Sequence, residues 1–206
     1  MRAFPVNPPP TSFTAWSDER RNADLRETMA RAPDPDALWV FAAGSLIWDP
    51  RFEPAETRAA TLQTHTRAFS FWTIRSRGSV ERPGLGLALE PGGECAGVAF
   101  LVPEQGREDI LDALWQREMS GGVYVPTWID ADTEFGTIPT LGFVANHAHR
   151  NYAGLAPLED AARIIADARG TRGTCHEYVA LLVEALDRHG LEDTHTRALH
   201  ERIQSH

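Results

Sequence analysis

The spacing of hydrophobic and polar positions changes along the chain, and this spacing predicts the elements. Through the middle of the chain, apolar, β-branched and aromatic residues form short runs separated by turn residues such as Gly92-Gly93, a pattern typical of β-strands. The run over residues 38–46 predicts a buried strand that ends in a loop, and further strands are predicted over residues 59–74, 85–90, 95–103, 123–131 and 138–147. A buried sheet is therefore expected at the centre of the molecule.

Helical spacing occurs once between the predicted strands and then over about the last fifty residues. Ile110, Leu111, Leu114 and Trp115 recur three and four residues apart and predict a helix over residues 104–119. Further helices are predicted over residues 157–168, 176–190 and 192–204. Central strands followed mostly by helices predict an α+β fold, or a small mixed β-barrel flanked by helices.

The first residues differ in composition from the rest, being richer in proline and in polar residues. Residues 5–13 are rich in proline and predict an extended segment, and Ser17 has the side chain of an N-cap for a short polar helix over residues 17–32. We therefore expect an N-terminal arm over residues 1–36 and a single domain over residues 37–206.

Composition excludes several classes of protein. The net charge is −9, which argues against a nucleic-acid binder, because such a protein needs a basic face. No apolar run approaches the ~18 residues of a membrane span, and the N-terminus lacks a signal-peptide core. Cys95 and Cys175 show no metal or disulfide spacing and are predicted to be free thiols. These features predict a soluble, cytoplasmic protein and leave its oligomeric state open.

A glycine and a serine interrupt the first apolar run, "VFAAGSLIW". Gly44 and Ser45 form either a simple bulge or turn, or a loop whose bare backbone N–H groups receive an anion. A second candidate anion site is the loop after residue 74, which carries Arg75 and Arg77 but also reads as an ordinary charged hairpin loop.

Glu118 is a candidate proton-transfer group. It follows a helical run, has apolar neighbours in sequence such as Trp115 and Met119, and precedes Gly121-Gly122, which would let a ligand or another segment come close. A carboxylate among apolar groups has a raised pKa, which suits acid–base chemistry. His147 and His149 would point the same way on a strand, but the sequence nominates no third ligand, so no metal site is predicted.

The order of these motifs resembles the ChaC-like family, the glutathione-specific γ-glutamylcyclotransferases. The resemblance runs from about residue 38 to residue 186 and rests on "GSLIW", "SRGSVERPGLGLAL", "CAGVAFLVP", "LWQREMSGGVYVPTW" and "YAGLAPLED". It implies a γ-glutamylcyclotransferase-like fold, a small mixed barrel or curved sheet with helices around it. It also implies a carbon–nitrogen lyase that uses no cofactor and cleaves glutathione into 5-oxoproline and cysteinylglycine.

The resemblance also implies site residues. The family's catalytic glutamate falls on Glu118, and its substrate loop falls on Ala43, Gly44, Ser45 and Leu46, with Ala43 in place of the family tyrosine. The family's Arg-Gly pair falls on Arg77 and Gly78. The tetrahedral oxyanion needs donors, for which the loop N–H groups or the hydroxyls of Tyr124 and Tyr178 are candidates.

Two other functions stay open at this point. Because alanine is smaller than tyrosine, position 43 could widen the pocket for another γ-glutamyl peptide or a γ-glutamylamine. A protein that only binds γ-glutamyl compounds is the third alternative, although an embedded carboxylate such as Glu118 argues for catalysis.

Overall fold

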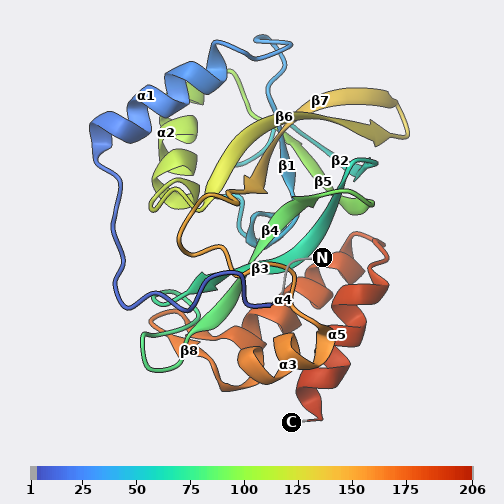
Figure 1. Cartoon of the computed structure of the whole chain (residues 1–206). Helices are drawn as coiled ribbons and strands as arrows, with labels where there is room; N and C mark the ends of the chain where they lie inside the picture. The colour runs from blue at the N-terminus through green and yellow to red at the C-terminus, as the bar shows by residue number, and fades with distance from the viewer. Residues whose placement is uncertain (1–3, 206) are drawn as a thin grey trace.

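Seven strands form one mixed sheet that closes on itself (Figure 1). The computed structural model describes residues 4–205 of the chain. The strands are β1 (Trp39–Ala42), β2 (Glu56–Leu62), β3 (His65–Thr73), β4 (Gly84–Pro91), β5 (Cys95–Leu101), β6 (Tyr124–Thr133) and β7 (Gly136–Ala145), in the order β1-β5-β2-β6-β7-β4-β3. An additional parallel pairing of β1 with β7 joins Trp39 to Thr140 and Val40 to Leu141. This pairing closes a mixed barrel, from which β4 and β3 extend, and it confirms the predicted α+β class.

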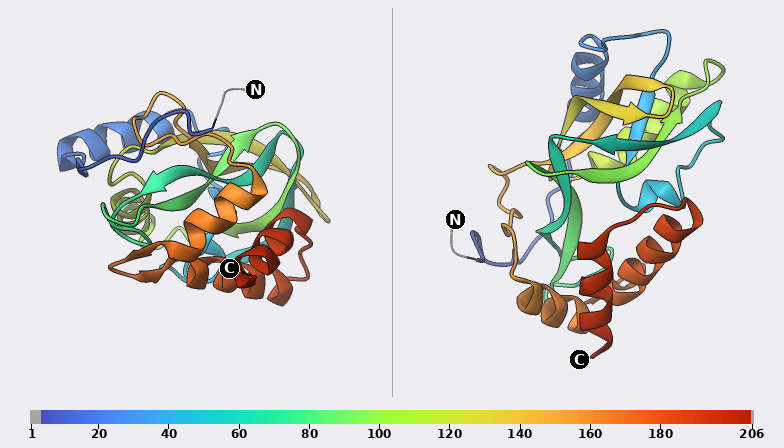
Figure 2. Two further views of the ribbon diagram at one scale, coloured as in Figure 1. Left: turned by 60° about the horizontal axis from the view of Figure 1, so that its bottom comes forward. Right: turned by 90° about the vertical axis from the view of Figure 1, so that its right-hand side faces the viewer.

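Helices cover the two ends of this sheet (Figures 1 and 2). Helices α1 and α2 lie together at one end, and α3, α4 and α5 gather at the other, beside β3 and β4. Their bounds are α1 (Asp18–Met29), α2 (Arg107–Glu118), α3 (Leu158–Asp167), α4 (Cys175–Arg188) and α5 (Thr194–Gln204). A 3-10 turn, η1 (Ser45–Ile47), follows β1, and the short strands β8 (Arg169–Gly170) and β9 (Gly173–Thr174) form a ribbon before α4. All predicted helices are present.

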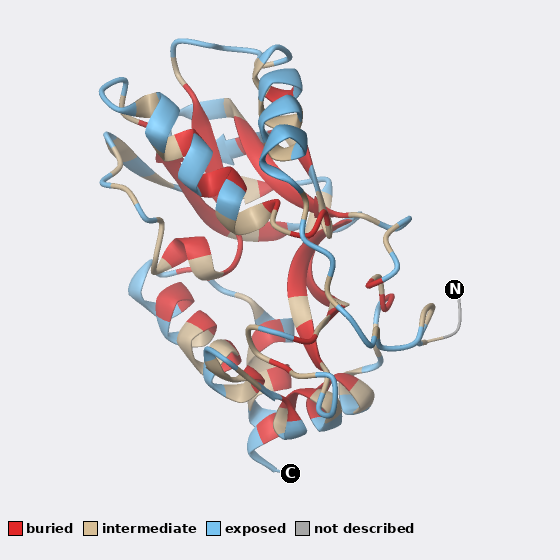
Figure 3. Ribbon diagram, turned by 90° about the vertical axis from the view of Figure 1, so that its left-hand side faces the viewer, coloured by how far each residue is buried: buried red, intermediate tan, exposed pale blue. Residues whose placement is uncertain are grey.

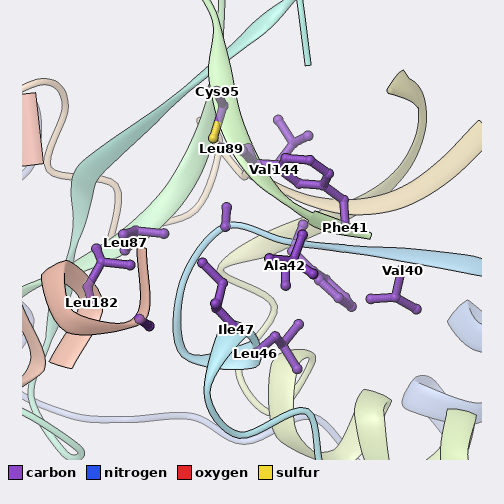
Figure 4. Close-up of a cluster of buried hydrophobic side chains, with 14 of the residues drawn as sticks. Val40, Phe41, Ala42, Leu46, Ile47, Leu87, Leu89, Cys95, Val144 and Leu182 are labelled. Atoms are coloured by element: carbon purple, nitrogen blue, oxygen red, sulfur yellow. The ribbon is translucent and has the colours of Figure 1, made fainter. Parts of the chain in front are cut away.

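The hydrophobic core runs from inside the barrel to the C-terminal helices. All four residues of β1 are buried, which explains why its sequence is continuously apolar. Figure 4 shows Leu46 and Ile47 of η1 close to this strand, with Leu182 of α4 near Leu87 of β4. The turn after β1 is therefore anchored by its own apolar side chains.

Two predicted strands differ from the structure. The run over residues 59–74 is two strands, β2 and β3, which break at Gln63-Thr64 and lie in different parts of the sheet. Periodicity alone did not reveal the break, because residues on both sides are β-branched or aromatic. The last predicted strand ends at Ala145, so His147 and His149 lie in the turns that follow it and not on a strand.

The N-terminal segment lies against the domain (Figure 3). Ser17 caps α1 as predicted, because its hydroxyl accepts a hydrogen bond from the Arg20 N–H at 3.3 Å. Before the helix the chain is extended, and its Val6 N–H donates to the Ala153 carbonyl at 2.7 Å. The division of the chain at residue 36 stays a prediction.

Within residues 4–205, none of the helices combines the length and the apolar character that crossing a membrane requires.

Candidate active site

Two adjoining hollows lie where the turn after β1 meets the end of α2 and the start of α4. The inner recess has a volume of about 40 Å³ and the outer cavity about 400 Å³. Ser45, Leu87, Glu118, Tyr124 and Tyr178 line both of them. Ala43, Gly44 and Leu46 line the inner recess, and Arg77 lines the outer cavity. The residues nominated from sequence thus lie around one connected space, although they come from five separate elements and loops.

Gly44 and Ser45, which interrupt the apolar run after β1, line the inner recess. A Cβ atom on Gly44 would stand 2.6 Å from the Tyr178 hydroxyl and 3.1 Å from Leu87, so only glycine leaves room there. The backbone of Gly44 has a φ of −139°, so close approach and not a positive φ requires the glycine. The Ser45 N–H is not bare, because it donates to the Tyr178 hydroxyl at 3.2 Å. The loop is thus held directly against α4.

Glu118 is the last residue of α2, and its carboxylate lines both hollows. Burial raises the pKa of this carboxyl, while the charges of Arg117 and Arg172 act in the opposite direction. Its place at the C-terminal end of a helix also disfavours negative charge, because the helix dipole is negative there. Glu118 is therefore a carboxylate adapted to exchanging a proton nearer to neutral pH than an exposed glutamate.

Arg117 connects the carboxylate with the loop. Its Nε atom lies 3.0 Å from Oε1 of Glu118, and its Nη2 atom donates to the Ser45 hydroxyl oxygen at 2.7 Å. Its Nη1 atom donates to the Asp49 carbonyl just beyond η1. One guanidinium thus fixes the distance between the candidate acid–base group and the candidate anion loop. Nothing in the sequence indicated this role, because neighbours on a helix normally point in different directions.

The hydroxyl groups of Tyr124 and Tyr178 differ in whether they are free to donate a hydrogen bond. The Tyr124 hydroxyl donates its proton to the Leu87 carbonyl at 2.9 Å, whereas the Tyr178 oxygen accepts from Ser45. Burial, with the nearby Glu118 charge, raises the pKa of Tyr178 to about 12 and the pKa of Tyr124 well above its usual value. Both remain protonated at neutral pH, and Tyr178 is the better placed to donate toward a ligand.

The outer cavity is rich in arginine. Arg75, Arg77, Arg117 and Arg172 line it, and Glu118 is its single lining carboxylate among the described residues, although the chain carries a net charge of −9. Arg77 is already engaged, since its Nη1 atom donates to the Thr174 carbonyl at 3.3 Å and lies 3.6 Å from Glu177. Loop 74–83 connects the antiparallel strands β3 and β4 as a hairpin, as one interpretation predicted, and its role in binding an anion stays a prediction.

The apolar residues around Glu118 are not those nearest to it in sequence. Trp115 turns toward α1, where its Nε1 atom donates to Asp24 at 2.8 Å, and Met119 is fully buried elsewhere in the core. The apolar atoms near the carboxylate come from other strands: Phe41, Leu87 and Phe143. Met119 is the next residue along the chain and points to another side, while the bond to Asp24 directs the Trp115 ring toward α1 although Trp115 lies one turn before Glu118.

The glycines after Glu118 accommodate the N-terminal arm. A Cβ atom on Gly121 would stand 2.8 Å from the Phe13 ring, and one on Gly122, whose φ is +73°, would stand 2.4 Å from the Trp16 ring. The segment that the glycines let come close is thus the chain's own N-terminus. Phe13 itself lines the outer cavity.

The histidine and cysteine side chains have other environments. His147 lies 2.6 Å from the buried carboxylate of Glu90, and no group of three ligating side chains that could hold a metal ion occurs within residues 4–205. Both cysteines are free, as predicted. Burial raises the pKa of Cys95 to about 11 and that of Cys175 to about 12, so neither is a thiolate at neutral pH.

Arg67 is a further residue that the sequence did not reveal. It is buried on β3 and donates from Nε to the Ala43 carbonyl at 2.6 Å and from Nη2 to the Ala96 carbonyl at 2.6 Å. Its third contact is an ion pair with Asp193, the N-cap of α5. Arg67 therefore fixes the turn that carries the loop.

Comparison with known proteins adds independent findings. A family model described as ChaC-like protein matches residues 38–206. The glutathione-specific γ-glutamylcyclotransferase of Escherichia coli (strain K12) is 38% identical over 179 residues, covering 86% of this chain and 78% of that protein. The glutathione-specific γ-glutamylcyclotransferase 1 of Rattus norvegicus is 30% identical over 207 residues, covering 97% and 87%.

A solved structure shows the same fold. The crystal structure of the γ-glutamyl cyclotransferase specific to glutathione from yeast matches with a TM-score of 0.76 at 18% identity, covering 82% of this chain and 96% of that one. This likeness confirms the fold that the resemblance implied.

Proposed function

This chain belongs to the ChaC-like protein family, and from that premise we propose that it cleaves glutathione by cyclising the γ-glutamyl group. The products are 5-oxoproline and cysteinylglycine. The observation that carries the proposal is the largely buried carboxylate of Glu118, whose side chain is 13% exposed and which is linked through Arg117 to the Ser45 loop across one connected cavity. Relatives that carry the name of this activity, at 30–38% identity over most of the chain, support it.

The γ-glutamyl head enters the inner recess. There the turn of Gly44, Ser45 and Leu46 receives its α-carboxylate, because successive N–H groups bind anions and Gly44 presents no side chain. The Ser45 N–H, which donates to the Tyr178 hydroxyl in the free protein, exchanges that partner for the carboxylate. The Ser45 hydroxyl, already held by Arg117, adds a further polar contact. The recess itself is small, so the rest of the substrate lies in the outer cavity.

The chemistry takes place within one substrate molecule. The α-amine attacks the γ-carbonyl carbon, a C–N bond closes the five-membered ring, and the bond to the cysteinyl nitrogen breaks. Because both reacting groups belong to one molecule, the enzyme mainly has to hold the folded conformer. The ammonium must first lose a proton, which Glu118 accepts as a general base; its raised pKa makes it effective in this role.

The same group completes the reaction. Protonated Glu118 then donates to the departing cysteinyl nitrogen, which restores the carboxylate. The ring nitrogen still carries one proton too many, and its loss gives the neutral lactam while the released amine of cysteinylglycine gains a proton and becomes an ammonium. The oxyanion that forms meanwhile is stabilised by a hydrogen bond from Tyr178, whose elevated pKa keeps its proton on the oxygen. Tyr124 orients the site through Leu87, since its proton is committed to that carbonyl.

A second candidate function keeps this chemistry and changes the leaving group. Ala43 stands where the family has a tyrosine, and it lines the inner recess, so the head pocket is wider on that side. With more room beside it, the γ-glutamyl head can take a different position in the recess and direct the leaving group differently into the outer cavity, and another γ-glutamyl peptide or a γ-glutamylamine would then be the preferred substrate. A protein that only binds γ-glutamyl compounds is disfavoured by the largely buried carboxylate at the recess, because holding a charge among apolar groups costs stability and a binding protein has no use for it beside an anion loop.

The test is a product assay with purified protein. Glutathione, γ-glutamylalanine and a γ-glutamylamine are supplied in turn, and 5-oxoproline is quantified by liquid chromatography. Release of 5-oxoproline together with cysteinylglycine at the highest kcat/KM supports the leading proposal. A higher kcat/KM with either of the other compounds supports the second candidate, and binding without release of 5-oxoproline from any of them contradicts both.

A cytoplasmic location is part of the same proposal. Cys95 and Cys175 are both free, which suits a reducing compartment where glutathione is abundant.

A further inference from the structure

The outer cavity has an unusual wall, contributed by the N-terminal arm. Phe13 lines the cavity, packs on Gly121 three residues after Glu118, and lies under the guanidinium of Arg75, whose Cζ atom is 4.4 Å from the ring centroid. The family model begins at residue 38, so this wall lies outside the part of the chain that the family defines. The arm therefore adds something of its own to the cavity.

The arm is held on both sides of Phe13. The Arg150 guanidinium donates to the Ser12 carbonyl at 2.6 Å and to the Thr14 hydroxyl oxygen at 3.2 Å, while the Trp16 N–H donates to the Ser120 carbonyl at 2.9 Å. Gly122 leaves space for the Trp16 ring. These contacts fix the position of the Phe13 ring, so it is a built part of the cavity wall.

Arg75 and Arg172 are the free cations of this wall. Within residues 4–205, neither guanidinium has an ion-pair partner or a hydrogen-bond acceptor within bonding distance. The loops that carry them are joined, because the Thr171 N–H donates to the Arg75 carbonyl and the Arg172 N–H donates to the Ser76 carbonyl, each at 2.8 Å. Two unpaired guanidinium groups thus face one cavity from adjacent loops. An arginine held on an aromatic ring keeps its N–H donors, and this arrangement suits a carboxylate.

We propose that Phe13 of the arm, Arg75 and Arg172 form a subsite for the C-terminal carboxylate of the substrate's leaving dipeptide. The proposal rests on the proposed function and names its substrate class: γ-glutamyl peptides that end in a free carboxylate. When the γ-glutamyl head occupies the inner recess, the remaining part of the substrate extends into the outer cavity, where these cations lie. Phe13 fixes Arg75, and Arg172 supplies the second charge.

The test compares glutathione with its glycyl monoethyl ester, in which an uncharged ethyl ester replaces the terminal carboxylate. Hydrogen bonds to charged groups contribute roughly 10- to 100-fold, so the wild-type kcat/KM is expected to be lower for the ester by this factor. The double variant Arg75→Gln/Arg172→Gln should treat both compounds alike within about threefold, with KM for glutathione raised. Both compounds are compared at one pH above the acidic limb of the profile, because Arg172 also lowers the pKa of Glu118. Phe13→Ala should reduce the preference for glutathione over the ester by up to about tenfold. Phe13→Leu keeps the packing but not the aromatic face, so it should reduce this preference to the same extent.

Matched controls separate this effect from general loss of charge or of aromatic surface. Arg169→Gln removes an exposed arginine from the same β8–β9 ribbon, and Phe135→Ala removes an exposed aromatic side chain from the β6–β7 turn. Neither residue lines the cavity, so both variants should keep the wild-type preference.

The outcomes separate the two levels of proposal. Equal wild-type kcat/KM for the two compounds, or an unchanged preference in the arginine double variant, overturns the subsite. Loss of the preference in the arginine variant but not in either Phe13 variant overturns the role of the arm. Titration calorimetry of both compounds on the Glu118→Gln protein measures the same preference as a ratio of Kd values, without turnover. If the wild-type protein cleaves neither compound but the Glu118→Gln protein binds glutathione at least 10-fold more tightly than the ester, the proposed function is contradicted and the subsite is supported.

Discussion

Replacing Glu118 with glutamine tests the central step of the proposed reaction. The Glu118 carboxylate lies 3.0 Å from Arg117 Nε, and the glutamine carbonyl oxygen can keep that contact, so the cavity should retain its shape. The amide cannot accept the proton of the substrate ammonium or deliver one to the leaving nitrogen. General acid–base catalysis contributes about 10²–10⁴ in rate, and here one group serves both transfers. We therefore expect kcat to fall by about 10⁴, equivalent to roughly 5 kcal/mol of barrier.

Glu118→Asp provides a graded comparison. It keeps the carboxylate but withdraws it by about 1.5 Å, one carbon–carbon bond. A misplacement of about 1 Å can cost about 10²-fold, so the aspartate variant should lie between the wild type and the glutamine variant. Single-turnover release of 5-oxoproline measures the rates, and titration of glutathione measures binding, which should change little because the loop holds the α-carboxylate.

Stability provides the control for folding. The pKa of Glu118 is raised in the folded protein, so its ionised form opposes folding; this cost is complete above the raised pKa and declines to zero as the pH falls from there to the ordinary glutamate pKa. The neutral amide avoids the cost, and the Tm of Glu118→Gln at pH 7 should equal or exceed that of the wild type. A folded Glu118→Gln protein that turns over glutathione within about tenfold of the wild type would refute the acid–base assignment.

Three further predictions concern the same site. Gly44→Ala should raise KM strongly, because its Cβ atom would stand 2.6 Å from the Tyr178 hydroxyl. Tyr178→Phe removes that hydroxyl, so the double variant should have a KM little higher than Tyr178→Phe alone, and strictly additive effects on KM would contradict this reasoning. The acidic limb of the kcat/KM profile should lie above the usual glutamate range, because burial raises the pKa of Glu118 while Tyr124 and Tyr178 stay neutral. It should move to higher pH in Arg172→Gln, because the charges of Arg172 and Arg117 lower that pKa, and an unmoved limb would exclude Glu118 as the titrating group. Treatment with a chelator should leave turnover unchanged, and a loss that a divalent ion restores would contradict metal-free chemistry.

Local sequence patterns predicted most of the fold. The apolar runs of β1 and β5 and the helical spacing of Leu111, Leu114 and Trp115 are strong signals, because burial fixes them directly. The break between β2 and β3 was missed, because two polar residues within a β-branched run produce almost no change in periodicity. Closure of the barrel depends on the β1–β7 pairing, which joins residues about a hundred positions apart, and no local pattern encodes it.

The candidate site was predicted unevenly for a related reason. The motifs of the loop and of Glu118 are local, and they nominated the residues around the inner recess. Arg117, Arg172 and Phe13 reach the cavity only through the packing of separate segments, so sequence spacing carried no signal for them. The Gly121-Gly122 pair did indicate a close approach, but only the structure identifies the approaching segment as the arm.

The buried ion pair of Arg67 and Asp193 connects the stability of the protein with its activity. The Arg67 side chain is 2% exposed and that of Asp193 is 14% exposed, and Arg67 also holds the carbonyls of Ala43 and Ala96. Breaking one side of a buried pair costs about 3–5 kcal/mol, because the remaining charge stays without a partner. Arg67→Met should therefore lower the free energy of unfolding by this amount in urea titrations.

The same change should also act on the site. Without the Arg67 Nε–H, the Ala43 carbonyl loses its donor, and the loop that follows it can shift away from Tyr178. At temperatures where the variant is folded, we expect KM for glutathione to rise by about tenfold or more, the effect of losing roughly 1.5 kcal/mol of loop positioning, while kcat falls less, because Glu118 is held by Arg117. Asp193→Asn keeps an oxygen that can cap α5 and leaves Arg67 bound to both carbonyls, so it should destabilise the protein with little change in KM. Equal effects of the two variants on KM would show that Arg67 supports the fold alone and does not position the loop.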